Sequence, residues 1–223
     1  MKSKHLSIVI VLIMMCCLFL GGCKKAADGD DDNDLTNRQN LEQSIAVVGS
    51  QLFNFVDLMV DLATTIPADA TYNAATGFWS FSIAAPTGES INVDMKFLND
   101  AGTVQKFYNP ATTKTMILKG DMTGLFGSMT YDLTVTGVEY ASSTLTVNGG
   151  GTITYVGITG SYSVNNVKIP KNAAYPASGT VSMSMYSVTA TLTYNGSNTV
   201  TATYSWMGHS YSVKINLDTG QIM

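Results

Sequence analysis

The chain has 223 residues, of which 45% are hydrophobic and only 13% are charged. This balance excludes a disordered protein, because disorder requires few aromatic residues and a high net charge. Once an apolar N-terminal block is set aside, the remaining length suits one domain with a sizeable core. All three cysteines lie at or before residue 23, which excludes a disulfide framework for that domain.

The N-terminus has the features of an export signal. Lys2 and Lys4 supply positive charge ahead of an apolar block at residues 6–20. The block has the length of a secretory signal and is too short for an ordinary membrane span. We therefore expect the protein to be exported to the cell envelope.

The apolar block ends in Leu20, Gly21, Gly22 and Cys23. This run resembles the lipobox of bacterial lipoproteins, in which an aliphatic residue and two small residues precede a cysteine. Small residues are needed there because the signal peptidase accepts only small side chains beside the bond that it cleaves. An ordinary signal peptide with a chance cysteine is the alternative interpretation.

The resemblance implies that residues 1–22 are removed and that Cys23 carries acyl chains in the membrane. Cys16 and Cys17 fit the lipobox less well, because Met15 and Cys16 directly precede them. Lys24 is not the aspartate that retains lipoproteins in the inner membrane, so the resemblance favours the outer membrane of a Gram-negative cell. The mature chain would then contain no free thiol for cysteine catalysis or metal binding.

Residues 23–36 are predicted to form an acidic, flexible tether, because like charges repel one another along the chain. Its carboxylates belong to Asp28, Asp30, Asp31, Asp32 and Asp34. A calcium loop with Asp28, Asp30 and Asp32 as ligands is the alternative. Asn33 stands where such a loop needs glycine and Gln39 where it needs glutamate, so no metal site is predicted.

A helix is predicted over residues 37–65, within a single domain at 37–223. Thr36 and Gln39 have the spacing of a capping box, and Pro67 follows the end of the pattern. The spacing predicts an apolar stripe that docks on the rest of the domain; self-association as a coiled coil is the alternative. This stripe consists of Leu41, Ile45, Val48, Leu52, Phe55, Met59 and Leu62, and the opposite, polar stripe of Ser50, Asn54, Asp57, Asp61 and Thr64.

Residues 71–223 are predicted to form antiparallel β-structure, because the hydrophobic period changes to two from Phe78 onward. The polar positions are mostly Thr and Ser, which suit an exposed strand face. Asn195-Gly196 marks a tight hairpin turn between two such runs. We expect nine or ten strands, and the absence of a second long helical pattern excludes parallel crossovers.

The predicted fold is mainly β (α+β), with the helix packed on a strongly curved antiparallel sheet or partly open barrel. The helix stripe would cover the apolar face that such a sheet must bury. A membrane β-barrel is the alternative, since its strands also alternate. That alternative would leave the amphipathic helix without a surface on which to dock.

No catalytic constellation is visible in the sequence, and we predict a non-enzymatic protein without cofactor or metal. His209 follows Gly208 in a turn between two strands, which explains both residues. The acidic residues after Thr71 are evenly scattered, so a carboxylate-based hydrolase remains only an alternative. No basic cluster exists that would bind nucleic acid.

The predicted function is to bind or carry an apolar ligand, or to scaffold envelope partners, while anchored to the membrane. An adhesion or interaction module with exposed Thr/Ser-rich strands is the alternative. A carrier needs a cavity above about 300 Å³ between helix and sheet. The candidate lining residues are Leu52, Phe55, Met59, Met183, Met185, Tyr204 and Trp206.

Overall fold

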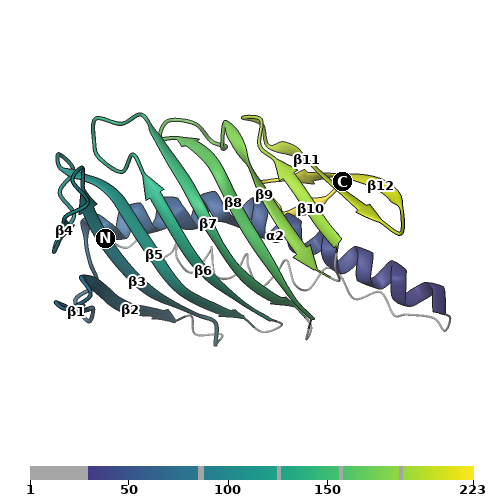
Figure 1. Ribbon diagram of the computed structural model, residues 1–223, viewed down its shortest axis with the longest axis horizontal. Helices are drawn as coiled ribbons and strands as arrows, with labels where there is room; N and C mark the ends of the chain where they lie inside the picture. The colour runs from purple at the N-terminus through teal and green to yellow at the C-terminus, as the bar shows by residue number, and fades with distance from the viewer. Residues whose placement is uncertain (1–29, 85–87, 125–126, 156–157, 186–187) are drawn as a thin grey trace.

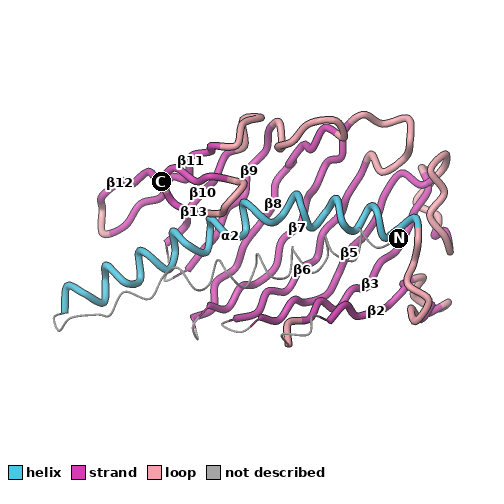
Figure 2. Tube along the Cα trace, turned by 180° about the vertical axis from the view of Figure 1, so that it is seen from behind, coloured by secondary structure: helices cyan, strands magenta, loops and turns pink. Residues whose placement is uncertain are grey.

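The computed structural model describes residues 30–84, 88–124, 127–155, 158–185 and 188–223. The lipobox residues, Cys23 and Asp28 lie outside them. In the described part of the chain, one helix, α2 (Asp30–Thr64), precedes a single antiparallel sheet and lies across one of its faces (Figures 1 and 2). The prediction of a mainly β domain with one N-terminal helix is therefore confirmed.

The strands follow one another along the chain with short connections. They are β1 (Thr71–Asn73), β2 (Phe78–Ala84), β3 (Ser90–Asn99), β4 (Val104–Gln105), β5 (Thr113–Gly124), β6 (Gly127–Thr136), β7 (Thr144–Tyr155), β8 (Ile158–Pro170), β9 (Ser178–Met185), β10 (Val188–Thr193), β11 (Thr199–Trp206), β12 (His209–Asn216) and β13 (Gln221–Ile222). Their order in the sheet is the order in the chain, except that β3 pairs with β5 and that β4 lies off this path, paired with β3.

The sheet has thirteen strands rather than nine or ten, and it is open rather than closed into a barrel. β1 and β13 lie at its two ends and do not pair with each other. Three of the thirteen strands, β1, β4 and β13, are very short. Each has only two or three residues, which is too few to display a period of two.

Helix α2 begins seven residues earlier than predicted, at Asp30, and ends at Thr64. It runs through Thr36 and Gln39, so these residues do not form a capping box at its start. The run of aspartates from Asp30 instead lies in the first turns of the helix. Part of the stretch predicted as a tether is therefore helical.

The polar stripe predicted for the helix is exposed only in its C-terminal half. Asp57, Asp61 and Thr64 are exposed, whereas Ser50 is fully buried. The Ser50 hydroxyl donates a hydrogen bond to the Val47 carbonyl oxygen at 3.2 Å, which allows its burial. By length and composition, Arg38–Thr64 could also cross a membrane, but most of it is buried inside the domain, as in the core helix of a soluble protein.

The face of the sheet toward α2, here called the inner face, carries the core, and the opposite face is called the outer face. Inner-face side chains such as Met95, Leu133 and Val181 are buried, and they alternate with polar outer-face residues. The helix lies close to the sheet at Gly49, where an added Cβ would be 2.5 Å from Leu192 Cδ1 of β10. The Tyr194 hydroxyl donates to the Gly49 carbonyl oxygen at 2.6 Å, which ties the helix to the sheet at this point.

Candidate functional site between the helix and the sheet

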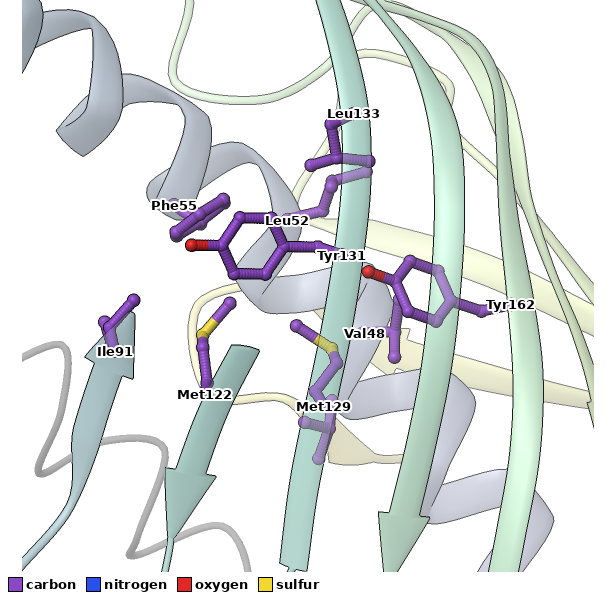
Figure 3. A pocket seen from close by; sticks show the side chains of 10 residues that line it. Val48, Leu52, Phe55, Ile91, Met122, Met129, Tyr131, Leu133 and Tyr162 are labelled. Atoms are coloured by element: carbon purple, nitrogen blue, oxygen red, sulfur yellow. The ribbon is translucent and has the colours of Figure 1, made fainter. Parts of the chain in front are cut away.

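An apolar cavity lies between α2 and strands β3, β5, β6 and β8 (Figure 3). Period-two alternation brings every second side chain of these strands to the inner face, and the helix supplies the opposite wall. The lining residues are Val47, Val48, Leu52, Phe55, Ile91, Met122, Met129, Tyr131, Leu133 and Tyr162. Two flexible methionines in this wall make the site adaptable in shape.

The two tyrosines in the cavity wall expose their rings to the cavity, whereas their hydroxyl groups are hydrogen-bonded to the backbone. Tyr131 donates to the Asn92 carbonyl oxygen at 2.5 Å, and Tyr162 donates to the Thr130 carbonyl oxygen at 3.0 Å. The Tyr131 ring also meets Phe55 of the helix edge to face, with ring centroids 4.8 Å apart. The cavity therefore offers apolar contact and no free hydrogen-bonding group from these tyrosines.

The cavity is nearly filled by its own lining, with a volume of about 20 Å³. This volume is close to the minimum that admits one water molecule and far below that of a ligand pocket. An apolar ligand would have to displace the helix or rearrange the methionine side chains. The cavity lined by the described residues is therefore not a preformed carrier pocket.

The predicted lining residues separate in the structure. Leu52 and Phe55 line the cavity, whereas the other five lie elsewhere in the buried core. These five are Met59, Met183, Met185, Tyr204 and Trp206. The lining residues on β3, β5, β6 and β8 were not predicted from the sequence, although alternation places them on the inner face once the strand order is known.

Tyr204 belongs to a polar cluster at the other end of the interface between helix and sheet. Its hydroxyl donates to a carboxylate oxygen of Glu42, which is only 8% exposed. Arg38 Nε lies 3.5 Å from the same oxygen, and its guanidinium stacks 5.0 Å from the Tyr211 ring centroid. Burial, followed by the hydrogen bond to Glu42, raises the pKa of Tyr204. This cluster fixes the helix to β11 and β12.

The outer face is lined by hydroxyl groups that bond from strand to strand. Thr130 Oγ1 lies 2.8 Å from Thr152 Oγ1, and Ser182 Oγ lies 3.0 Å from Thr191 Oγ1. A broad, open hollow of about 660 Å³ lies over β10, β11 and β12. Five of its eight lining residues are exposed and carry a hydroxyl group: Thr189, Thr203, Ser205, Ser210 and Ser212; Val188, Tyr204 and Tyr211 complete the lining.

Two carboxylates, those of Asp94 and Asp121, line a hollow of about 290 Å³ on the outer face near β3 and β5. The Ser80 hydroxyl donates to Asp94, and the Asn92 side-chain amide donates to Asp121 at 3.0 Å. Within the described residues, no group of three or more His, Cys, Asp or Glu side chains gathers that could hold a metal ion.

The geometry defines the protein as an open, all-antiparallel sheet of consecutive strands with one long helix on its inner face. Comparisons of the chain with protein-family models, with curated protein sequences and with solved structures gave no match.

The buried tyrosines predict that the domain loses stability at alkaline pH. Burial is the main cause that raises the pKa values of Tyr131, Tyr162 and Tyr194 above the ordinary value near 10. A raised pKa means that the folded state binds the proton more tightly. The stability is therefore complete below about pH 10 and falls by roughly 1.4 kcal/mol per pH unit and per tyrosine above it.

Urea unfolding from about pH 8 to about pH 11 measures this slope. Tyr162→Phe should lessen the decline, whereas Tyr140→Phe should leave it unchanged, because Tyr140 is 89% exposed. An equal decline in both variants would contradict the assignment to the buried hydroxyl groups.

Proposed function

We propose that the protein is a lipid-anchored component of the bacterial cell envelope that acts as a non-enzymatic scaffold or interaction module. The lipobox-like run at Leu20–Cys23 supports the anchor and the location. The outer membrane is the proposed membrane, on the basis of Lys24. The observation that carries the interaction role is the contrast between a filled inner face and an exposed, hydroxyl-lined outer face.

The volumes support binding at the outer surface rather than inside the domain. The inner cavity of about 20 Å³ is too small for a ligand, whereas the hollow over β10 to β12 measures about 660 Å³. Its Ser and Thr hydroxyl groups can donate and accept hydrogen bonds to a polar partner surface. A carrier of apolar ligands is not favoured, because it would require the helix to separate from the sheet.

The proposal predicts that a photo-crosslinking side chain at Thr203 captures a partner in intact cells. Thr203 is exposed on the outer face and lines the hollow. A crosslinker at Tyr140, which is 89% exposed but does not line the hollow, is the matched control, and it should yield no adduct with another protein. Equal adducts from both positions, or none from Thr203, would contradict the interaction role.

Native mass spectrometry of the purified mature protein separates this role from carriage. We expect a mass that corresponds to the chain and its own acyl groups. An additional co-purifying lipid would instead support the carrier function.

A further inference from the structure

An exposed aromatic cluster lies at the end of the sheet where β1 and β4 are found (Figure 1). The rings of Tyr72 and Trp79 have centroids 5.1 Å apart, and those of Trp79 and Phe107 have centroids 5.5 Å apart. The Trp79 indole N–H donates to the Lys106 carbonyl oxygen at 2.5 Å, which holds the segment after β4 against β2. We call Tyr72, Trp79, Lys106 and Phe107 the end patch.

The end patch is apolar where it is most exposed. Phe107 is 59% exposed and is one of the few large hydrophobic residues that reach the surface in the described residues. Tyr72 and Trp79 are half-buried beside it, and each side chain carries one polar atom. Exposed apolar groups that adjoin amphipathic aromatic rings are characteristic of surfaces that bind a partner or a membrane.

A positive charge is held within this apolar surface. The Lys106 ammonium lies 5.2 Å from the Tyr72 ring centroid and 5.4 Å from that of Phe107. No carboxylate among the described residues pairs with it. The ammonium group therefore remains available to an anion that approaches the patch from outside.

We propose that the end patch binds the headgroup region of an anionic lipid bilayer. Phe107 would enter the boundary of the acyl chains, the Trp79 and Tyr72 rings would lie at the level of the headgroups, and Lys106 would bind a lipid phosphate. This is the order in which apolar, aromatic and cationic side chains are distributed across a membrane interface. An acidic protein surface would satisfy Lys106 but would leave Phe107 without apolar contact.

The position of the end patch suggests that its membrane contact orients the domain on the bilayer. This inference rests on the proposed lipid anchor. Helix α2 has 35 residues and spans about 52 Å, and its C-terminal end leads directly into β1 of the patch. Cys23 precedes the opposite end of the helix by seven residues. An anchor at one end and the patch at the other would hold the domain with its long axis along the membrane surface.

The test uses the purified mature chain mixed with vesicles of brominated phosphatidylglycerol, because bromine quenches nearby tryptophan fluorescence. The chain has two tryptophans, and Trp79→Phe gives the contribution of the buried Trp206. We expect quenching of Trp79 in the vesicle-bound protein and its loss in Lys106→Gln/Phe107→Ser. Tyr140→Ser is the matched control, and it should retain the quenching. High salt should reduce the contribution of Lys106.

Each other outcome has a defined meaning. A chain that sediments with vesicles but is quenched no more than Trp79→Phe would overturn the patch and leave the lipid anchor intact. A chain that neither sediments nor is quenched would overturn both proposals. A dimer that dissociates in Lys106→Gln/Phe107→Ser, without lipid quenching, would assign the patch to a second copy of the chain and overturn the membrane contact.

Discussion

Replacement of Cys23 by serine is expected to abolish the incorporation of a labelled fatty acid into the protein and to block removal of residues 1–22. A serine hydroxyl is not the thiol that lipoprotein maturation modifies, so neither the acyl groups nor the cleavage that depends on them should follow. The loss should be complete rather than partial, because two or three acyl chains at one residue provide the stable anchor.

The measurement is metabolic labelling with a fatty-acid analogue, combined with the mass of the product. Cys17→Ser is the matched control, because it removes a thiol six residues earlier and leaves Leu20–Cys23 intact. Unchanged labelling and mass in Cys23→Ser would refute the lipoprotein assignment. The assignment to the envelope as an anchored protein would then have no support.

Gly120→Ala should strongly destabilise the sheet. Gly120 of β5 has a φ of 149° and lies between β3 and β6. An added Cβ would overlap the Asn92 carbonyl oxygen of β3, and the Tyr131 hydroxyl would lie 2.7 Å from it. That carbonyl oxygen also accepts the Tyr131 hydrogen bond beside the apolar cavity.

We expect Gly120→Ala to lose several kcal/mol of unfolding free energy, a large share of the 5–15 kcal/mol typical of a domain. Gly102→Ala is the control, because Gly102 also has a positive φ of 74° but no atom within 4 Å of an added Cβ. It should lose only about 1 kcal/mol, the strain of the left-handed conformation. Urea unfolding of both variants measures the difference, and similar losses would show that the contact with Asn92 is unimportant.

The local pattern of the sequence predicted which segments form helix or strand better than it predicted the residues at which they begin and end. Alternation is a property of neighbouring residues, so the long strands could be recognised before their partners were known. The start of α2 was predicted at the wrong residue, because Thr36 and Gln39 have the spacing of a capping box. The same two residue types also occur at this spacing inside a helix, and here the residues before them are helical as well. The aspartates from Asp30 onward are favourable at a helix start and in a tether alike.

The candidate site was predicted only in part, because its residues come from distant parts of the chain. Leu52 and Phe55 were expected at the inner face, and they line the cavity. Tyr204 was also expected to line the cavity. Its hydroxyl instead bonds to Glu42, 162 residues earlier in the chain, outside the cavity. No periodicity connects two such residues, and their contact depends on where the helix crosses the strands.

From its sequence alone, the chain could be assigned to a mainly β, antiparallel class with one helix before the sheet. Hydrophobic periodicity carries that information, since it sets which side of each element must avoid water. Only the tertiary structure decided that the sheet stays open and that the inner cavity is filled. It also decided that aromatic rings gather around Lys106 at the end of the sheet that carries β1 and β4. These features depend on strand order, on the close approach at Gly49 and on side-chain packing, all of which arise between residues far apart in the chain.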